Sequence, residues 1–158
     1  MSDRAEQKNS NVLRWVTFRL AKEIYGINVT QVREVLRITE IAPVPGASDY
    51  VIGIINLRGN VVTVIDTRKR FGLPSIDTDD SSRIVIIEVE GQEVGILVDS
   101  VAEVVDLAMD EIEPAPNVGS DETARYIQGV SSMEGELLIL IDLNRFLTEE
   151  ELQDMGAL

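Results

Sequence analysis

The stretch that decides the fold runs from Gly53 to Asp66 and reads GIINLRGNVVTVID. Two runs rich in β-branched residues flank the dipeptide Arg58-Gly59, a pattern typical of a tight turn between antiparallel strands. We therefore predict one strand from Tyr50 to Leu57 and its partner from Asn60 to Ile65. The aspartate that follows is suited to cap a short helix over residues 66–71.

The same pattern occurs a second time in the chain. With a shift of 69 residues, Gly26 aligns with Gly95 and Val32 aligns with Val101; after an insertion of seven residues, Gly53 aligns with Gly129. Further matches are Glu34 with Glu103, Val35 with Val104, Pro45 with Pro114, Gly59 with Gly135, and Ile65-Asp66 with Ile141-Asp142. A duplicated fold keeps such glycines and apolar residues. We predict two similar β-lobes, lobe one at about residues 15–82 and lobe two at about 83–147, joined by residues 72–82.

The remaining pattern is also mostly β. Further strands are predicted at Val16–Leu20, Ile24–Asn28, Ile84–Val89, Glu93–Val98, Ile127–Met133 and Leu137–Ile141. A second short helix is predicted over residues 142–147, and Thr148 with Glu151 forms a capping box that predicts a helix in the C-terminal tail, residues 148–158. The polar residues 1–12 are interpreted as a flexible tail. Many short strands with frequent turns favour small barrels or a sandwich.

Composition excludes several classes of function. The 158 residues carry a net charge of −14, which disfavours binding to nucleic acid or to an anionic membrane. The chain has no cysteine and no histidine, so it lacks thiol chemistry, the usual general base and the commonest transition-metal ligand. No run is long enough for a membrane span, and the N-terminus does not resemble a signal peptide, so we predict a cytoplasmic protein.

Two acidic groups are weak candidates for chemistry. Asp77, Asp79 and Asp80 have the oxygen ligands that calcium or magnesium prefers, but the glycine and distal glutamate of a calcium loop are absent, so a solvated linker is favoured. Glu88 and Glu90 alternate along a predicted strand, where an exposed polar face is favoured over a hydrolase dyad. We therefore predict no metal site and no cofactor.

Two other features favour protein contacts. Val29, Val32 and Val35 recur every three residues among charged side chains, which indicates either a helical turn on the core or an apolar ridge suited to an interface. The turn at Arg58 corresponds to Glu134 in the second repeat. The fold alone does not require this difference, so Arg58 is either a solvated turn residue or a contact for a partner that only one lobe meets.

At this point the sequence resembles the CheW family of chemotaxis coupling proteins. The resemblance covers residues 13–147, and the GIINLRG turn in register with the other motifs makes it specific. The motifs are Tyr25-Gly26-Ile27, Val44-Pro45-Gly46, Gly53–Gly59, Val64-Ile65-Asp66, Arg70–Leu73, Val94–Asp99, Ile112-Glu113-Pro114 and Leu140–Leu143. The family implies a mainly β fold of two five-stranded SH3-like barrels that share a core, and it implies no enzyme activity.

The resemblance also implies partners and contact residues. The family joins the cytoplasmic tips of methyl-accepting chemoreceptors to a CheA-type histidine kinase, through the kinase's regulatory domain, so we expect recruitment to membrane-associated receptor arrays without insertion into the membrane. By position, the kinase-binding patch falls on Val16, Val29 and Val32. The receptor-binding residues fall on Glu34, Arg58, Val101 and Val104.

Two alternatives remain. An enzyme that uses carboxylates alone would need two acids converging in a pocket, and the spacing does not show this. A CheV-type protein would carry a receiver domain after this region, and because the sequence stops at Leu158 a stand-alone adaptor is favoured.

Overall fold

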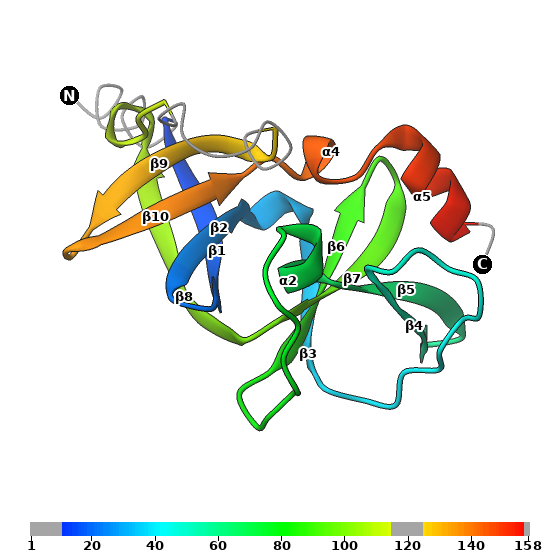
Figure 1. Ribbon diagram of the computed structural model, residues 1–158. Coiled ribbons are helices and arrows are strands. Elements are labelled where there is room, and N and C mark those ends of the chain that lie inside the picture. The colour runs from blue at the N-terminus through cyan, green and yellow to red at the C-terminus, as the bar shows by residue number, and fades with distance from the viewer. Residues whose placement is uncertain (1–10, 115–124, 157–158) are drawn as a thin grey trace.

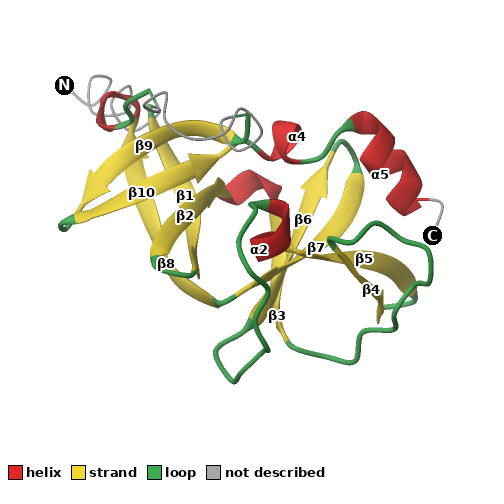
Figure 2. Cartoon of the chain, viewed as in Figure 1, coloured by secondary structure: helices red, strands yellow, loops and turns green. Residues whose placement is uncertain are grey.

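Ten strands in two sheets make up most of the chain. The computed structural model describes residues 11–114 and 125–156. The strands are β1 (Val12–Leu20), β2 (Glu23–Asn28), β3 (Val32–Arg37), β4 (Val51–Leu57), β5 (Asn60–Asp66), β6 (Arg83–Val89), β7 (Gln92–Val98), β8 (Ser100–Ala108), β9 (Ile127–Met133) and β10 (Glu136–Ile141). The short helices are η1 (Val29–Gln31), α2 (Thr67–Arg70), η2 (Met109–Glu111), α4 (Leu143–Phe146) and α5 (Glu149–Gly156). Figure 2 shows how far strands outweigh helices.

The two sheets have the same strand order under the repeat, but each draws strands from both halves of the chain. Sheet A has the order β8-β1-β2-β10-β9, and sheet B has the order β3-β6-β7-β5-β4. In Figure 1 the blue strands near the N-terminus lie with the orange strands near the C-terminus in sheet A, while cyan and green strands form sheet B. Strands five apart in the chain are equivalent, β1 with β6 through to β5 with β10. Replacing each strand of sheet A by its equivalent gives the strand order of sheet B. The duplication is therefore present in the fold.

The predicted lobe boundaries do not describe the sheets. A division at residue 82 would put β1–β5 in one lobe and β6–β10 in the other, whereas each sheet takes two strands from one repeat and three from the other. In each sheet two ladders join strands of different repeats: a parallel one, β2 with β10 and β5 with β7, and an antiparallel one, β1 with β8 and β3 with β6. Local sequence pattern defines where strands lie but not which strands pair, so the exchange was not predicted.

The sheets are also not closed. Among the described strands, no ladder joins β8 to β9 or β3 to β4, so the prediction of closed SH3-like barrels is not confirmed. Isolated bridges partly fill these gaps, one from Ala42 to Ile54 and its repeat counterpart from Glu113 to Val130. Each bridge passes tightly over a glycine: a Cβ on Gly53 would lie 2.1 Å from the Ala42 carbonyl oxygen. This contact explains why both repeats carry glycine there.

Three apolar clusters hold the sheets together. One lies inside sheet A around Trp15, Leu138 and Leu140, and one inside sheet B around Val64 and Ile86. The largest is shared by both sheets; it includes Phe18, Ile27, Val85, Val94, Ile96 and Phe146. The shared cluster makes the two sheets one packing unit, because neither sheet can expose that face to water without losing its burial.

The chain crosses between the sheets at two places. The first crossing is η1, between β2 and β3, which lies against β1 and β6. The second is Asp99, between β7 and β8, whose carboxylate accepts hydrogen bonds from the Ala21 N–H (2.8 Å) and the Arg68 guanidinium (2.8 and 2.6 Å). The bond from Arg68 holds the pKa of the Asp99 carboxyl below its usual value.

Most predicted local structure is confirmed. Asp66 and Asp142 cap α2 and α4, and Thr148 with Glu151 caps α5. Arg70 at the end of α2 forms an ion pair with Glu151 of α5 through two contacts of 2.7 Å, which holds α5 in place. The predicted tail at residues 1–12 lies mostly outside the described residues, and Val12 already belongs to β1.

Because of the exchange, neither half of the chain contains a complete sheet. We predict that a fragment ending at Asp80 does not fold alone, since it lacks β6 and β7 from the middle of sheet B and β8, β9 and β10 from sheet A. Mixing the fragments 1–80 and 81–158 should restore structure, and calorimetry with circular dichroism measures both outcomes. A cooperative melting transition from the first fragment alone would contradict the exchanged topology.

Candidate protein-binding surface

The valine spacing that the sequence shows at residues 29–35 comes from a β-bulge. Only residues 29–31 form a helical turn, because Val32 begins β3, so a helical turn accounts for only part of the spacing. The register shifts between Val32, opposite Ile87, and Glu34, opposite Ile86. One extra residue in a strand makes side chains three apart share a face. Val32 and Val35 therefore lie on the same face of β3; Val32 packs against the shared core, whereas Val35 is 41% exposed.

The second repeat has the same bulge in β8. Val101 lies opposite Phe18 and Val104 lies opposite Val16, so two residues of β8 fit between partners that are separated by one residue of β1. Val101 is half-buried against the shared core, and Val104 is 54% exposed. Of the predicted receptor-binding valines, Val104 thus offers the larger surface.

The three predicted kinase-binding valines differ in burial. Val16 is 6% exposed and belongs to the shared core. In this structure its side chain packs in the core and leaves almost no surface for a partner. Val29 in η1 and Val32 in β3 are half-buried against the same core, each with part of its side chain at the surface. Val29 also lines a hollow together with Val12, Arg14, Asp106, Ala108 and Glu111.

Glu34 and Arg58 form an ion pair. Their side chains make two parallel contacts, Nη1 to Oε1 at 3.2 Å and Nη2 to Oε2, between β3 and the β4–β5 turn. The hydrogen bond from Arg58 lowers the pKa of the Glu34 carboxyl below its usual value, so the pair is charged at neutral pH. The Arg58 side chain remains 67% exposed, against 27% for Glu34.

The position of Arg58 is fixed by its turn. Its φ is +51° and that of Gly59 is +87°, which confirms the predicted tight hairpin turn. The Gly59 N–H donates to the Asn56 side chain at 2.9 Å, which closes the turn. The repeat counterpart Glu134 has φ +48°, so the two turns share a backbone and differ in charge.

The structure brings some predicted site residues together and separates others. Glu34 and Arg58 are in contact, and Val101 and Val104 lie on one face of β8. Glu34 lies opposite Ile86 of the sheet B cluster, on the other face of β3 from Val32. The ion pair and the valines are thus two adjacent features of β3, on its opposite faces.

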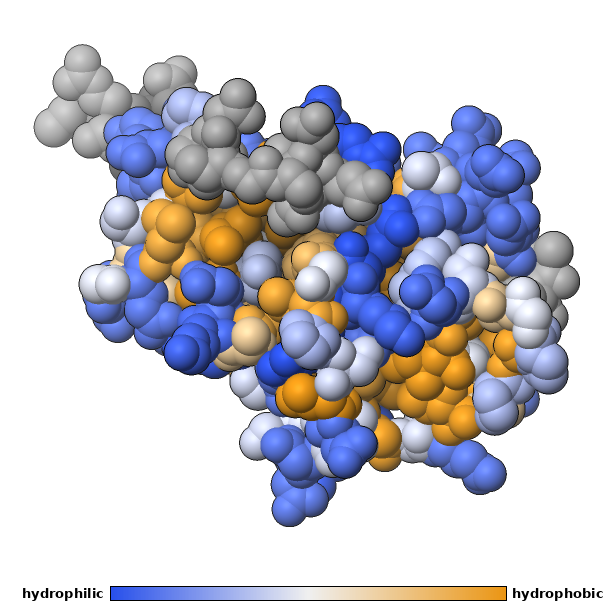
Figure 3. All heavy atoms as spheres, in the orientation of Figure 1, coloured by the Kyte–Doolittle hydropathy of each residue, from blue (hydrophilic) through white to orange (hydrophobic). Residues whose placement is uncertain are grey.

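Sequence reasoning missed several exposed apolar residues. They are Val12, Val61, Ile76, Met109 and Leu137, besides Val35, which was noted without a role. Figure 3 shows apolar residues gathered at the surface over parts of both sheets. Val61 and Leu137 are repeat counterparts, as are Val35 and Val104, so the duplication was the signal that would have found these pairs.

The acidic candidates do not form a reactive site. Glu88 pairs with Arg33, and Glu90 lies in a hairpin turn rather than on a strand beside Glu88. Asp79 accepts the Ser81 N–H at 2.8 Å and so shapes its own turn. No three acidic side chains in residues 11–114 and 125–156 are grouped so that they could hold a metal ion. Exposed valines beside a paired charge are instead the composition of a protein interface.

Comparisons with known proteins agree with this geometry. The family model described as the CheW-like domain matches residues 14–151, which span all ten strands but the first two residues of β1. The chain belongs to the CheW-like family. A chemotaxis protein CheW of Bacillus subtilis is 38% identical over 140 residues, 89% of this chain and 90% of that protein.

Further CheW-like relatives cover nearly the whole chain. The chemotaxis protein CheW of Treponema pallidum is 32% identical and covers 95% of this chain and 91% of its own length. The crystal structure of the scaffolding protein TtCheW from Thermoanaerobacter tengcongensis superposes with a TM-score of 0.79 at 36% identity, over 85% of this chain and 91% of that one. Among the described residues no helix is long and apolar enough to cross a membrane.

The Glu34–Arg58 pair generates a stability prediction. Replacing Arg58→Glu puts two carboxylates where an ion pair stood, and because the site is exposed we expect the melting temperature to fall by at most a few degrees. The double variant Glu34→Arg with Arg58→Glu restores opposite charges and should recover most of that loss. Calorimetry of the parent and the two variants measures both effects; an unfolded Arg58→Glu variant would show that the arginine holds the fold.

Proposed function

We propose that this protein is a non-enzymatic adaptor that couples transmembrane chemoreceptors to a CheA-type histidine kinase. One observation carries the proposal: the CheW-like match spans residues 14–151 and thus both sheets, and relatives that match over such lengths are named chemotaxis and scaffolding proteins. The site supports this function because it offers apolar and paired charged groups for protein contact and no cluster of reactive side chains among the described residues.

The kinase-binding residues of the proposal are Val29 and Val32. Both lie where the chain crosses from sheet A to sheet B, and both are half-buried, so a partner would cover the part of each side chain that faces water. Val16 lies beneath this region in the shared core and supports it by packing. An apolar contact centre of this kind contributes strongly when a partner excludes water from it.

The receptor-binding residues of the proposal are Glu34 and Arg58 on sheet B, and Val101 and Val104 on sheet A. The guanidinium of Arg58 is held in a fixed direction by Glu34 yet is mostly exposed, so its remaining N–H groups can donate to carbonyls or carboxylates of a receptor tip. Val104 adds an exposed apolar contact on β8. In this proposal one receptor tip contacts residues of both repeats.

The two contacts predict a double dissociation. Val32→Asp should weaken direct kinase binding about tenfold or more, because it places a carboxylate in an apolar contact, while receptor binding is retained. Arg58→Glu should abolish most receptor-stimulated kinase activity, while direct kinase binding is retained. Arg58→Lys should recover only part of that activity, since it keeps the charge but loses the planar fork.

Val104→Asp is the comparison variant for Val32→Asp. The same substitution then stands in the second repeat at an exposed site, and it should weaken receptor binding and leave kinase binding within twofold. Titration calorimetry with purified kinase and a reconstituted receptor–kinase phosphorylation assay measure these outcomes, and melting curves confirm that each variant is folded. Kinase binding by Val32→Asp at the parent affinity, or full receptor stimulation with Arg58→Glu, would reject the corresponding assignment.

A further inference from the structure

Two arginines face each other across the strands β3 and β6. In the antiparallel register, Arg37 lies directly opposite Arg83. Side chains at opposed positions of this kind lie on the same face with Cβ atoms about 4.5–5.5 Å apart, and like charges there destabilise the pair. In the other repeat the same positions hold Asp106 and Arg14, which form an ion pair of 2.9 Å. The duplicated fold thus pairs opposite charges in one sheet and like charges in the other.

The charge of the arginine pair is not neutralised within the described part of the chain. Arg83 donates through Nη1 to two backbone carbonyls, those of Asp80 (2.7 Å) and Ser82 (2.8 Å), and forms no ion pair there. Arg37 is exposed and has neither a side-chain hydrogen bond nor an ion pair among the described residues. Arg33, nearby on β3, is neutralised by Glu88, and Arg58 by Glu34.

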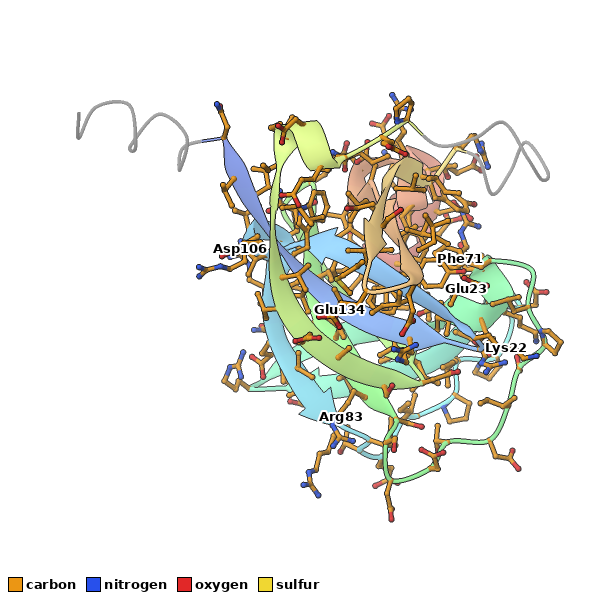
Figure 4. All side chains as sticks on the ribbon, turned by 90° about the vertical axis from the view of Figure 1, so that its left-hand side faces the viewer. Lys22, Glu23, Phe71, Arg83, Asp106 and Glu134 are labelled. Carbon is orange, nitrogen blue, oxygen red and sulfur yellow. The ribbon has the colours of Figure 1, made fainter. Side chains whose placement is uncertain are left out.

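The two arginines line a hollow at the surface. Its other lining residues are Ile38, Asp79, Asp80 and Ser82. The Asp79 carboxylate accepts a hydrogen bond from the Ser81 N–H. Asp80 is exposed and adds a negative charge near the arginines. Figure 4 shows Arg83 at the lower end of the molecule, beside the end of β3. The hollow thus presents the exposed side chain of Arg37 and the partly exposed side chain of Arg83.

We propose that Arg37 and Arg83 form a docking site for an acidic segment of a partner protein. Guanidinium groups bind carboxylates with paired, charge-assisted hydrogen bonds, and two of them side by side fit neighbouring aspartate or glutamate side chains. Binding would relieve the repulsion between the arginines. The site is independent of the adaptor proposal, since it shares no residue with the kinase-binding or receptor-binding set.

Binding of a fluorescent oligoglutamate peptide to the full chain at low ionic strength tests the proposal. The parent should bind the peptide, more weakly as salt is added. Arg37→Gln should lower the affinity about tenfold or more. Arg14→Gln is the matched control, because it removes the same charge at the repeat-related position, and it should change the affinity less than about twofold. Asp80→Asn should strengthen binding.

A second variant separates binding from folding. Arg37→Asp recreates the arrangement of Asp106 with Arg14, so it should raise the melting temperature while it abolishes peptide binding. The proposal is overturned if the parent does not bind oligoglutamate, if Arg37→Gln and Arg14→Gln lose affinity equally, or if Arg37→Asp retains binding. Inorganic phosphate that displaces the peptide at equal concentration would identify a small-anion site and overturn the acidic segment as the occupant.

Discussion

The parallel pairing of β2 with β10, and of β5 with β7, is the constraint on which the rest of the structure depends. Together with the antiparallel ladders β1–β8 and β3–β6, these two ladders build each sheet from two strands of one repeat and three of the other. The chain must then cross between the sheets twice, at η1 and at Asp99. Residues next to both crossings belong to the shared apolar cluster. The exposed valines Val35 and Val104 and the carboxylate of Glu34, which pairs with Arg58, lie on β3 and β8, the strands that follow the crossings.

Duplication with divergence explains the distribution of charge. Backbone features that the fold needs occur in both repeats: a bulge in β3 and in β8, and a left-handed residue in the turns at Arg58 and Glu134. Charged side chains at equivalent positions differ instead, with Arg58 against Glu134 and Arg37 against Asp106. Because the backbone tolerates either sign, these positions are free to be shaped by partners, and in an asymmetric complex the two sheets can meet different ones.

The sequence predicted local structure, but it did not predict which strands pair over long range. Aspartate caps, the Arg58-Gly59 turn and eight of the ten strands follow from patterns within a few residues. Strands β3 and β8 were missed because a bulge produces the spacing of three that also indicates a helix. The contact of Glu34 with Arg58 and the burial of Val16 depend on how strands are exchanged, which no local pattern encodes.

Cross-linking across the parallel ladder tests the exchanged topology most directly. The chain has no native cysteine, and Tyr25 of β2 lies opposite Ile139 of β10. Neighbouring strands are about 4.8 Å apart, within disulfide range. The account predicts that Tyr25→Cys with Ile139→Cys forms a disulfide in the folded protein. In the same account Tyr25→Cys with Thr63→Cys forms none, although an unexchanged repeat would pair those two positions. Cross-linking of the second pair, and not of the first, would contradict it.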